Sequence, residues 1–108
     1  MKSHSQASKN KRKEKKKRRA GSKLVKQQLI SLSHGCYCHL CSQKMRRKEE
    51  IQMHHLIRLA DGGLTTLENG SLLCEECHHI VHSFDNDPVR YEHLRQIIIK
   101  QKIERIAK

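Results

Sequence analysis

Four cysteines in the middle of the chain have the spacing of a metal site. Cys38 and Cys41 form one C-x-x-C pair, and Cys74 and Cys77 form another. Together they can supply four thiolates in a tetrahedron, the arrangement typical of a structural Zn²⁺. Two disulfides are the alternative, but disulfides are typical of exported domains. No apolar export segment precedes the cysteines. We therefore expect zinc, with Cys36, which breaks the spacing, outside the site.

Histidines near the second cysteine pair could form another metal site. His78 and His82 are four residues apart in a segment that we expect to be helical, so their imidazoles project from one face. A histidine from the preceding strand would complete a three-ligand site with open positions, the kind that performs chemistry. The pair His54-His55 lies in that strand. Adjacent strand residues face opposite sides, so both can reach one site only where the strand twists or ends.

Short elements must position these residues. Alternating apolar residues predict a strand over residues 50–56, and a second short strand should lead into Cys74. The sequence Asp61-Gly62-Gly63 predicts a turn between them, and residues 75–84 should form a helix. Two strands and a helix indicate a small α+β fold. Aromatic residues make up only 3% of the sequence, so we expect a thin core that depends on bound zinc for its stability.

Two helices should flank this unit. The first is expected over residues 23–33, with Ser22 as its N-cap and Gly35 at its C-terminal end. Its apolar positions are Leu24, Val25, Leu29 and Leu32. The second should begin with Asp87 as N-cap and Pro88 at the first helical position. Its apolar stripe, which could pack on the core or form a homodimer, consists of Leu94, Ile97, Ile98, Ile99, Ile103 and Ile106.

Basic residues are concentrated at the start of the chain. Residues 1–33 contain twelve Lys or Arg and one acidic residue, so they carry nearly all of the net charge of +12. We expect a disordered tail over residues 1–21 that binds phosphates, with nuclear targeting or solubility as alternatives. The candidate nucleic-acid-binding residues of the tail are Lys9, Lys11, Arg12, Lys13, Lys15, Lys16, Lys17, Arg18 and Arg19. Arg46 and Arg47 are two further candidates outside the tail.

The order of these motifs resembles the HNH endonucleases, in the branch that carries four zinc-binding cysteines. The matching features are the two C-x-x-C pairs, His54-His55, Gly62-Gly63, Leu67-Glu68-Asn69 and His78 directly after Cys77. Asn69 and His78 lie fourteen and twenty-three residues after His55, which is the family's spacing. The resemblance covers residues 34–83 and implies the ββα-metal fold, with a Cys₄ structural zinc, flanking helices and a basic tail. Gly70 replaces a residue that is usually apolar, and we expect it to loosen the second strand.

The resemblance also implies roles for individual residues. His55 would be the general base that activates water, and Asn69 would tie the loop to the strand and orient that base. His54, His78 and His82 would bind a catalytic divalent ion, which we expect to be Mg²⁺, Mn²⁺ or Ni²⁺. The implied activity is metal-dependent hydrolysis of DNA phosphodiester bonds, with one strand nicked per active site.

The expected organisation is a basic tail over residues 1–21, a nuclease domain with zinc knuckles over residues 22–87, and a C-terminal helix over residues 88–108. DNA is the expected partner, and RNA is an alternative for the tail. A noncatalytic Cys₄ nucleic-acid-binding module, or an accessory subunit of a larger phage or mobile-element nucleoprotein complex, is the alternative to a nuclease. No stretch approaches the ~20 apolar residues of a membrane span. We therefore expect the protein in the cytoplasm or nucleoid, or in the nucleus of a eukaryote.

Overall fold

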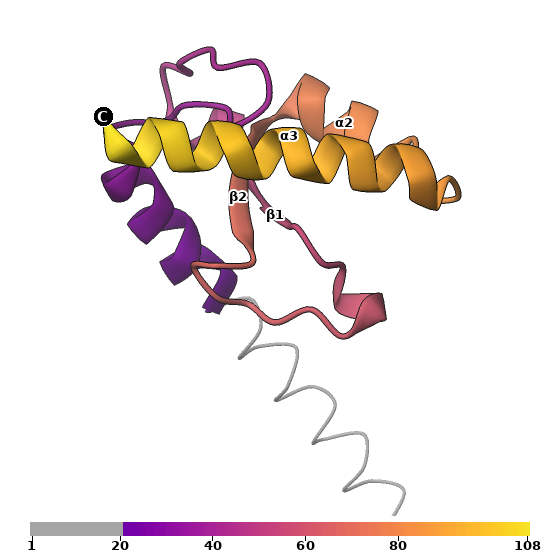
Figure 1. The fold of residues 1–108 in the computed structure, drawn as a ribbon. Helices are drawn as coiled ribbons and strands as arrows, with labels where there is room; N and C mark the ends of the chain where they lie inside the picture. Colours follow the sequence, from indigo (N-terminus) through magenta and orange to yellow (C-terminus); the bar gives the residue numbers. More distant parts are fainter. Residues whose placement is uncertain (1–20) are drawn as a thin grey trace, which may run out of the picture.

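The structure is a computed structural model that describes residues 21–108. The tail that the sequence predicts, including the basic residues between positions 9 and 19, lies outside the described residues, apart from Gly21. Figure 1 shows a central β-hairpin with one helix on each side and a long helix across it. None of the helices in residues 21–108 has the length and apolar character needed to cross a membrane.

The hairpin is a two-stranded antiparallel sheet. Strand β1 (Ile51–His55) pairs with β2 (Gly70–Cys74) in a register that sets Ile51 opposite Cys74 and His55 opposite Gly70. A short 3-10 helix, η1 (Lys48–Glu50), precedes β1, and a second, η2 (Leu59–Asp61), lies in the connection between the strands. We call this connection, residues 56–69, the connector. Both strands occur where the sequence predicts them, within one residue at each end of β1.

Helix α2 (Glu75–His82) follows β2 without a loop. Cys74 ends the strand and is also the N-cap of the helix, and Glu75 and Glu76 occupy the first turn, where the helix dipole favours acidic side chains. The helix stops two residues before the predicted end at residue 84. This direct succession of β1, β2 and α2 confirms the predicted ββα arrangement.

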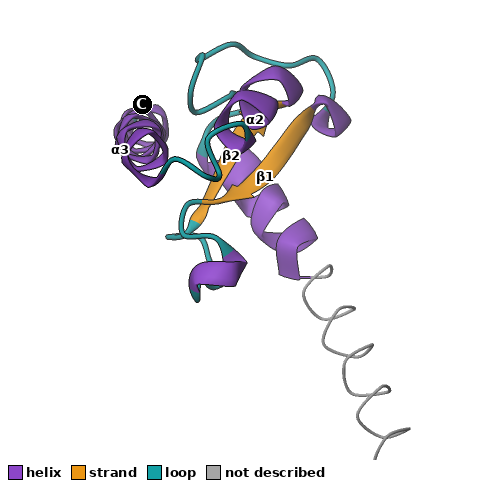
Figure 2. Ribbon diagram, turned by 90° about the vertical axis from the view of Figure 1, so that its right-hand side faces the viewer, coloured by secondary structure: helices purple, strands orange, loops and turns teal. Residues whose placement is uncertain are grey.

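Helix α3 (Pro88–Ala107) runs across the hairpin and is seen end-on in Figure 2. Its start agrees with the prediction, because Pro88 is the first helical residue and the Asp87 carboxylate accepts a hydrogen bond from the Arg90 amide at 3.2 Å. Only part of the predicted apolar stripe of α3 is buried against the core. Ile98 is fully buried, whereas 61% of Ile103 is exposed.

The N-terminal helix, residues 21–32, packs against the hairpin. Val25 and Leu29 face the core, but Leu24 and Leu32 are 56% and 43% exposed, so the contact stripe is narrower than predicted. Ser22 is not the N-cap, because residues 21 and 22 are already helical. The helix ends at residue 32, and the chain turns away from it, as expected, at Gly35, whose φ of +139° favours glycine.

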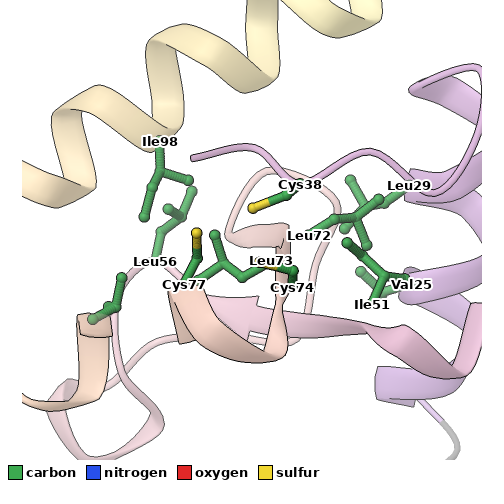
Figure 3. Packing of buried hydrophobic residues seen from close by; sticks show 11 residues of the cluster. Val25, Leu29, Cys38, Ile51, Leu56, Leu72, Leu73, Cys74, Cys77 and Ile98 are labelled. Atoms are coloured by element: carbon green, nitrogen blue, oxygen red, sulfur yellow. The ribbon is translucent and has the colours of Figure 1, made fainter. Parts of the chain in front are cut away.

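The core is small and contains three of the cysteines. Figure 3 shows Cys38, Cys74 and Cys77 among the buried aliphatic side chains that join the hairpin to its flanking helices. Gly70 belongs to this packing, and the expectation that it loosens the second strand is wrong. A Cβ at Gly70 would lie 3.0 Å from side-chain carbons of both Val25 and Leu29, so the missing side chain lets the N-terminal helix approach β2 closely.

Candidate active site

The fold brings the four C-x-x-C cysteines together into what we call the cysteine cluster. Cys38 and Cys41 come from the turn before η1, and Cys74 and Cys77 come from the junction of β2 and α2. All four Sγ atoms lie within 4.8 Å of one another, and those of Cys41 and Cys74 are 3.9 Å apart. The turn that carries Cys38 and Cys41 can stabilise a thiolate, because the backbone amides of Leu40 and Cys41 donate to the Cys38 sulfur at 3.4 and 3.5 Å.

The electrostatics of this cluster are those of a site that needs a cation. Burial opposes ionisation of Cys38, but backbone hydrogen bonds outweigh it and lower the pKa of this thiol. Burial raises the pKa of Cys41 and Cys77, and the neighbouring Cys38 sulfur raises the pKa of both thiols further. None of the five cysteines is in a disulfide, and Cys36 lies outside the cluster. Four thiols at these distances fit a structural Zn²⁺.

His39, which was not predicted to have a role, lies in the turn between Cys38 and Cys41 and ties this turn to the rest of the fold. Its Nδ1 accepts a hydrogen bond from the Leu72 amide at 3.0 Å, and its Nε2 donates to Ser33 Oγ at 2.9 Å. Burial lowers the pKa of His39 to about 4, so the imidazole is neutral at pH 7. One side chain thus links the residue that follows the N-terminal helix, the cysteine turn and β2.

Three histidines form a second group, which we call the histidine cluster. His54 comes from β1, and His78 and His82 come from successive turns of α2, as their i, i+4 spacing predicts. One ring nitrogen from each lies within 4.8 Å of the others. The Nε2 atoms of His78 and His82 are 2.9 Å apart. Burial lowers the pKa of His78, and burial with the neighbouring imidazoles lowers that of His54 to about 3.

Two polar side chains orient the α2 histidines. His78 Nδ1 donates to Gln52 Oε1, and His82 Nδ1 donates to Asp85 Oδ2 at 3.2 Å. With both protons on Nδ1, the two Nε2 lone pairs point at each other, and such a pair repels unless a cation lies next to it. The histidine cluster therefore has the donors of a divalent-ion site. Sequence reasoning missed Gln52 and Asp85, although Asp85 stands three residues after His82.

His55 lies beside this cluster although it neighbours His54 in the strand. It is the last residue of β1, so it reaches the same hollow as His54 at the point where the strand ends. The hollow has a volume of about 300 Å³ and is lined by Met53, His54, His55, Arg58, Leu59, His78 and His82. The His55 Nε2 atom is 3.0 Å from Thr65 Oγ1, and burial lowers the pKa of His55.

Asn69 holds the connector to the end of β1. Its Oδ1 accepts from the Ile57 amide at 2.7 Å, and its Nδ2 donates to the carbonyl oxygens of Ile57 and Leu64 at 3.0 and 2.8 Å. The Leu56 amide donates to the Asn69 carbonyl at 2.8 Å. Asn69 therefore fixes the chain that directly follows His55, without a hydrogen bond to the imidazole itself.

The described basic residues that the sequence analysis proposed for nucleic-acid binding lie elsewhere. Arg46 and Arg47 are exposed on the loop before η1 and do not line the histidine hollow. Arg47 lines a different depression together with four glutamates, Glu49, Glu50, Glu75 and Glu76. These carboxylates would repel a phosphate, so the position of Arg47 does not favour the predicted contact.

Comparison with known proteins places the cysteine and histidine clusters in one recognised unit. Residues 38–84 match the family of HNH endonucleases. This segment begins at Cys38 and ends just after α2, so it contains both clusters, the connector and the hairpin. No curated protein shows significant similarity to the chain.

Proposed function

We propose that this protein, whose residues 38–84 form an HNH endonuclease domain, is a metal-dependent enzyme that hydrolyses phosphodiester bonds of DNA. One observation carries the proposal: His55 and the three members of the histidine cluster line the same hollow. A base and an ion site on one cavity wall are the two components that hydrolysis of a phosphodiester requires.

We propose that His55 is the general base. If its Nε2 donates to Thr65 Oγ1 at 3.0 Å, its Nδ1 keeps the lone pair that can accept the proton of an attacking water. The lowered pKa keeps the imidazole neutral, and thus able to accept this proton, at pH 7. Asn69 acts indirectly, because it fixes the backbone that follows His55.

We propose that His54, His78 and His82 hold the catalytic divalent ion and that the cysteine cluster holds zinc. An ion at the histidine cluster would supply positive charge to stabilise the leaving oxygen of the phosphodiester. Mg²⁺, Mn²⁺ and Ni²⁺ are the candidates, and imidazole donors favour the transition-metal ions among them. His54 and His78 need no deprotonation at neutral pH before they bind an ion, because burial lowers the pKa of both imidazoles.

We propose that the positive charge of Arg58 attracts a phosphate to the hollow. Among the described residues that line the hollow it is the one with a permanent positive charge. Its Nε contacts the Asp61 carboxylate at 2.9 Å, and its guanidinium also donates to the Asp85 carbonyl at 3.3 Å. We propose that these contacts hold Arg58 at the rim and that the basic tail adds affinity that does not depend on sequence.

We also propose the division of labour among the segments. Residues 22–87 would form the nuclease domain, residues 1–21 the nucleic-acid-binding tail, and residues 88–108 a helix that completes the domain. A single active site cuts a single strand, so a monomer should nick duplex DNA, and double-strand cleavage would need a homodimer or a larger nucleoprotein complex.

Plasmid cleavage tests the proposal. Supercoiled plasmid incubated with the protein and Mg²⁺, Mn²⁺ or Ni²⁺ should be converted to open circles, and His55→Ala should slow this by about 10²–10⁴-fold without loss of zinc. His79→Ala is the matched control, because His79 is exposed on α2 outside the cluster. Equal rates for His55→Ala and wild type would refute the base assignment. Binding without cleavage by the wild type, with every ion, would instead indicate a noncatalytic module.

A further inference from the structure

Helix α3 lies outside the matched segment, yet one of its side chains reaches the histidine cluster. The Tyr91 phenol oxygen is 3.1 Å from His54 Nε2. The same oxygen is 3.4 Å from the His55 carbonyl oxygen and 3.3 Å from the Leu56 carbonyl oxygen. Tyr91 thus meets the backbone at the end of β1 and the histidine that β1 contributes to the cluster.

The protons in this contact can be assigned from the partners. A phenol has one proton to donate and can also accept, whereas a carbonyl oxygen can only accept. The Tyr91 hydroxyl satisfies both kinds of partner if it donates to a carbonyl and accepts from an Nε2–H of His54. His54 is then protonated on Nε2, and its lone pair is on Nδ1.

This assignment completes the donor set of the cluster. Gln52 and Asp85 place the protons of the two α2 histidines on Nδ1, which leaves their Nε2 atoms free. Tyr91 likewise places the proton of His54 on one ring nitrogen, Nε2, which leaves Nδ1 free. In these tautomers each of the three imidazoles has one lone pair available to an ion.

We infer that Tyr91 is a positioning residue of the ion site, and that its hydroxyl fixes the tautomer and ring orientation of His54. The inference rests on the proposed function only in that it takes the histidine cluster as the ion site. It makes α3 part of the active centre and not merely a cover for the core. The ring of Tyr91 also lies under the Arg58 guanidinium, 5.6 Å from its centroid, so the same side chain supports the residue at the rim.

The test removes only the hydroxyl. Tyr91→Phe keeps the ring that packs against Arg58. Tyr37→Phe is the matched control, because it removes the same atom from a tyrosine whose ring lies against Arg105 and not against the histidine cluster. Long-range ¹H–¹⁵N spectra of the full chain, with one equivalent of zinc and no other ion, should show wild-type His54 protonated on Nε2. Tyr91→Phe should give a mixture of tautomers, and Tyr37→Phe should give the wild-type spectrum.

Calorimetric titration with Ni²⁺ provides the second measurement. Loss of an outer hydrogen bond to a ligating imidazole typically weakens metal binding by about 10–100-fold, and we expect this for Tyr91→Phe but not for Tyr37→Phe. The inference is overturned if wild-type His54 carries its proton on Nδ1, a result that does not require the variant to fold. It is equally overturned if Tyr91→Phe keeps both the tautomer and the Ni²⁺ affinity. Failure of the wild type to cleave plasmid would sink the proposed function but leave the tautomer measurement decisive.

Discussion

Replacing Gly63 by alanine should break the hydrogen bonds by which Asn69 holds the two ends of the connector together. A Cβ at Gly63 would lie 1.8 Å from the Ile57 carbonyl oxygen, 2.7 Å from its carbon and 2.9 Å from Asn69 Nδ2. The first two contacts are with backbone, so no side-chain rotation can relieve them. The chain must move by more than about 1 Å to reach an ordinary carbon–oxygen separation. Such a shift breaks the hydrogen bonds that join Ile57 and Asn69.

The expected loss of stability follows from those hydrogen bonds. Asn69 makes three through its side chain, two with Ile57 and one with Leu64. At roughly 1 kcal/mol each, their loss would lower the free energy of unfolding by about 3 kcal/mol. This is a large part of the stability of a small domain. Cleavage should fall as well, because the same bonds fix the backbone that follows His55.

Gly62→Ala is the matched control for this prediction. Gly62 has a φ of +87°, but nothing lies within 4 Å of the position of its Cβ, so the variant suffers backbone strain of about 1–2 kcal/mol without a clash. Urea unfolding of both variants, followed by circular dichroism, measures the difference. A Gly63→Ala protein no less stable than Gly62→Ala would refute the anchoring role assigned to Asn69.

Two further predictions concern groups away from the histidine hollow. Cys38→Ser should abolish zinc retention and unfold much of the domain, whereas Cys36→Ser, outside the cluster, should leave zinc content unchanged; equal zinc contents would contradict the cysteine site. Lys102→Met should cost about 1–3 kcal/mol in urea unfolding, because the buried ammonium donates to the carbonyl oxygens of residues 67–68 at 2.5 and 3.2 Å. Burial lowers the pKa of Lys102, so the unfolded chain binds more protons just below pH ~10.4, and wild-type stability should rise with pH there. The absence of that rise, or its persistence in Lys102→Met, would refute this account.

The sequence predicts best what spacing determines. C-x-x-C pairs and an i, i+4 histidine pair state directly which side chains lie together, because the local backbone decides it. The start of α3 was likewise predictable, since Asp87 and Pro88 act on the adjacent turn. Both strands and their ββα order were predictable from apolar patterns and the turn between them.

Features that depend on packing were not predictable. His39, Gln52 and Tyr91 contact partners that are distant in sequence or lie on another element, and nothing in their own neighbourhood indicates this. Gly70 was misinterpreted for the same reason, because its role is the approach of the N-terminal helix. The exposed Leu24 shows that an apolar stripe is an upper limit on the surface that a helix buries.

Metal binding by two neighbouring histidine variants tests the central claim most directly. His78 belongs to the histidine cluster, and His79, next to it on α2, is exposed and outside it. In calorimetric titrations of zinc-loaded protein with Ni²⁺ or Mn²⁺, wild type and His79→Ala should bind one further ion with equal affinity. His78→Ala should bind it at least about 10-fold more weakly. Wild-type affinity in His78→Ala would contradict the assignment of the histidine cluster as the site of the catalytic ion.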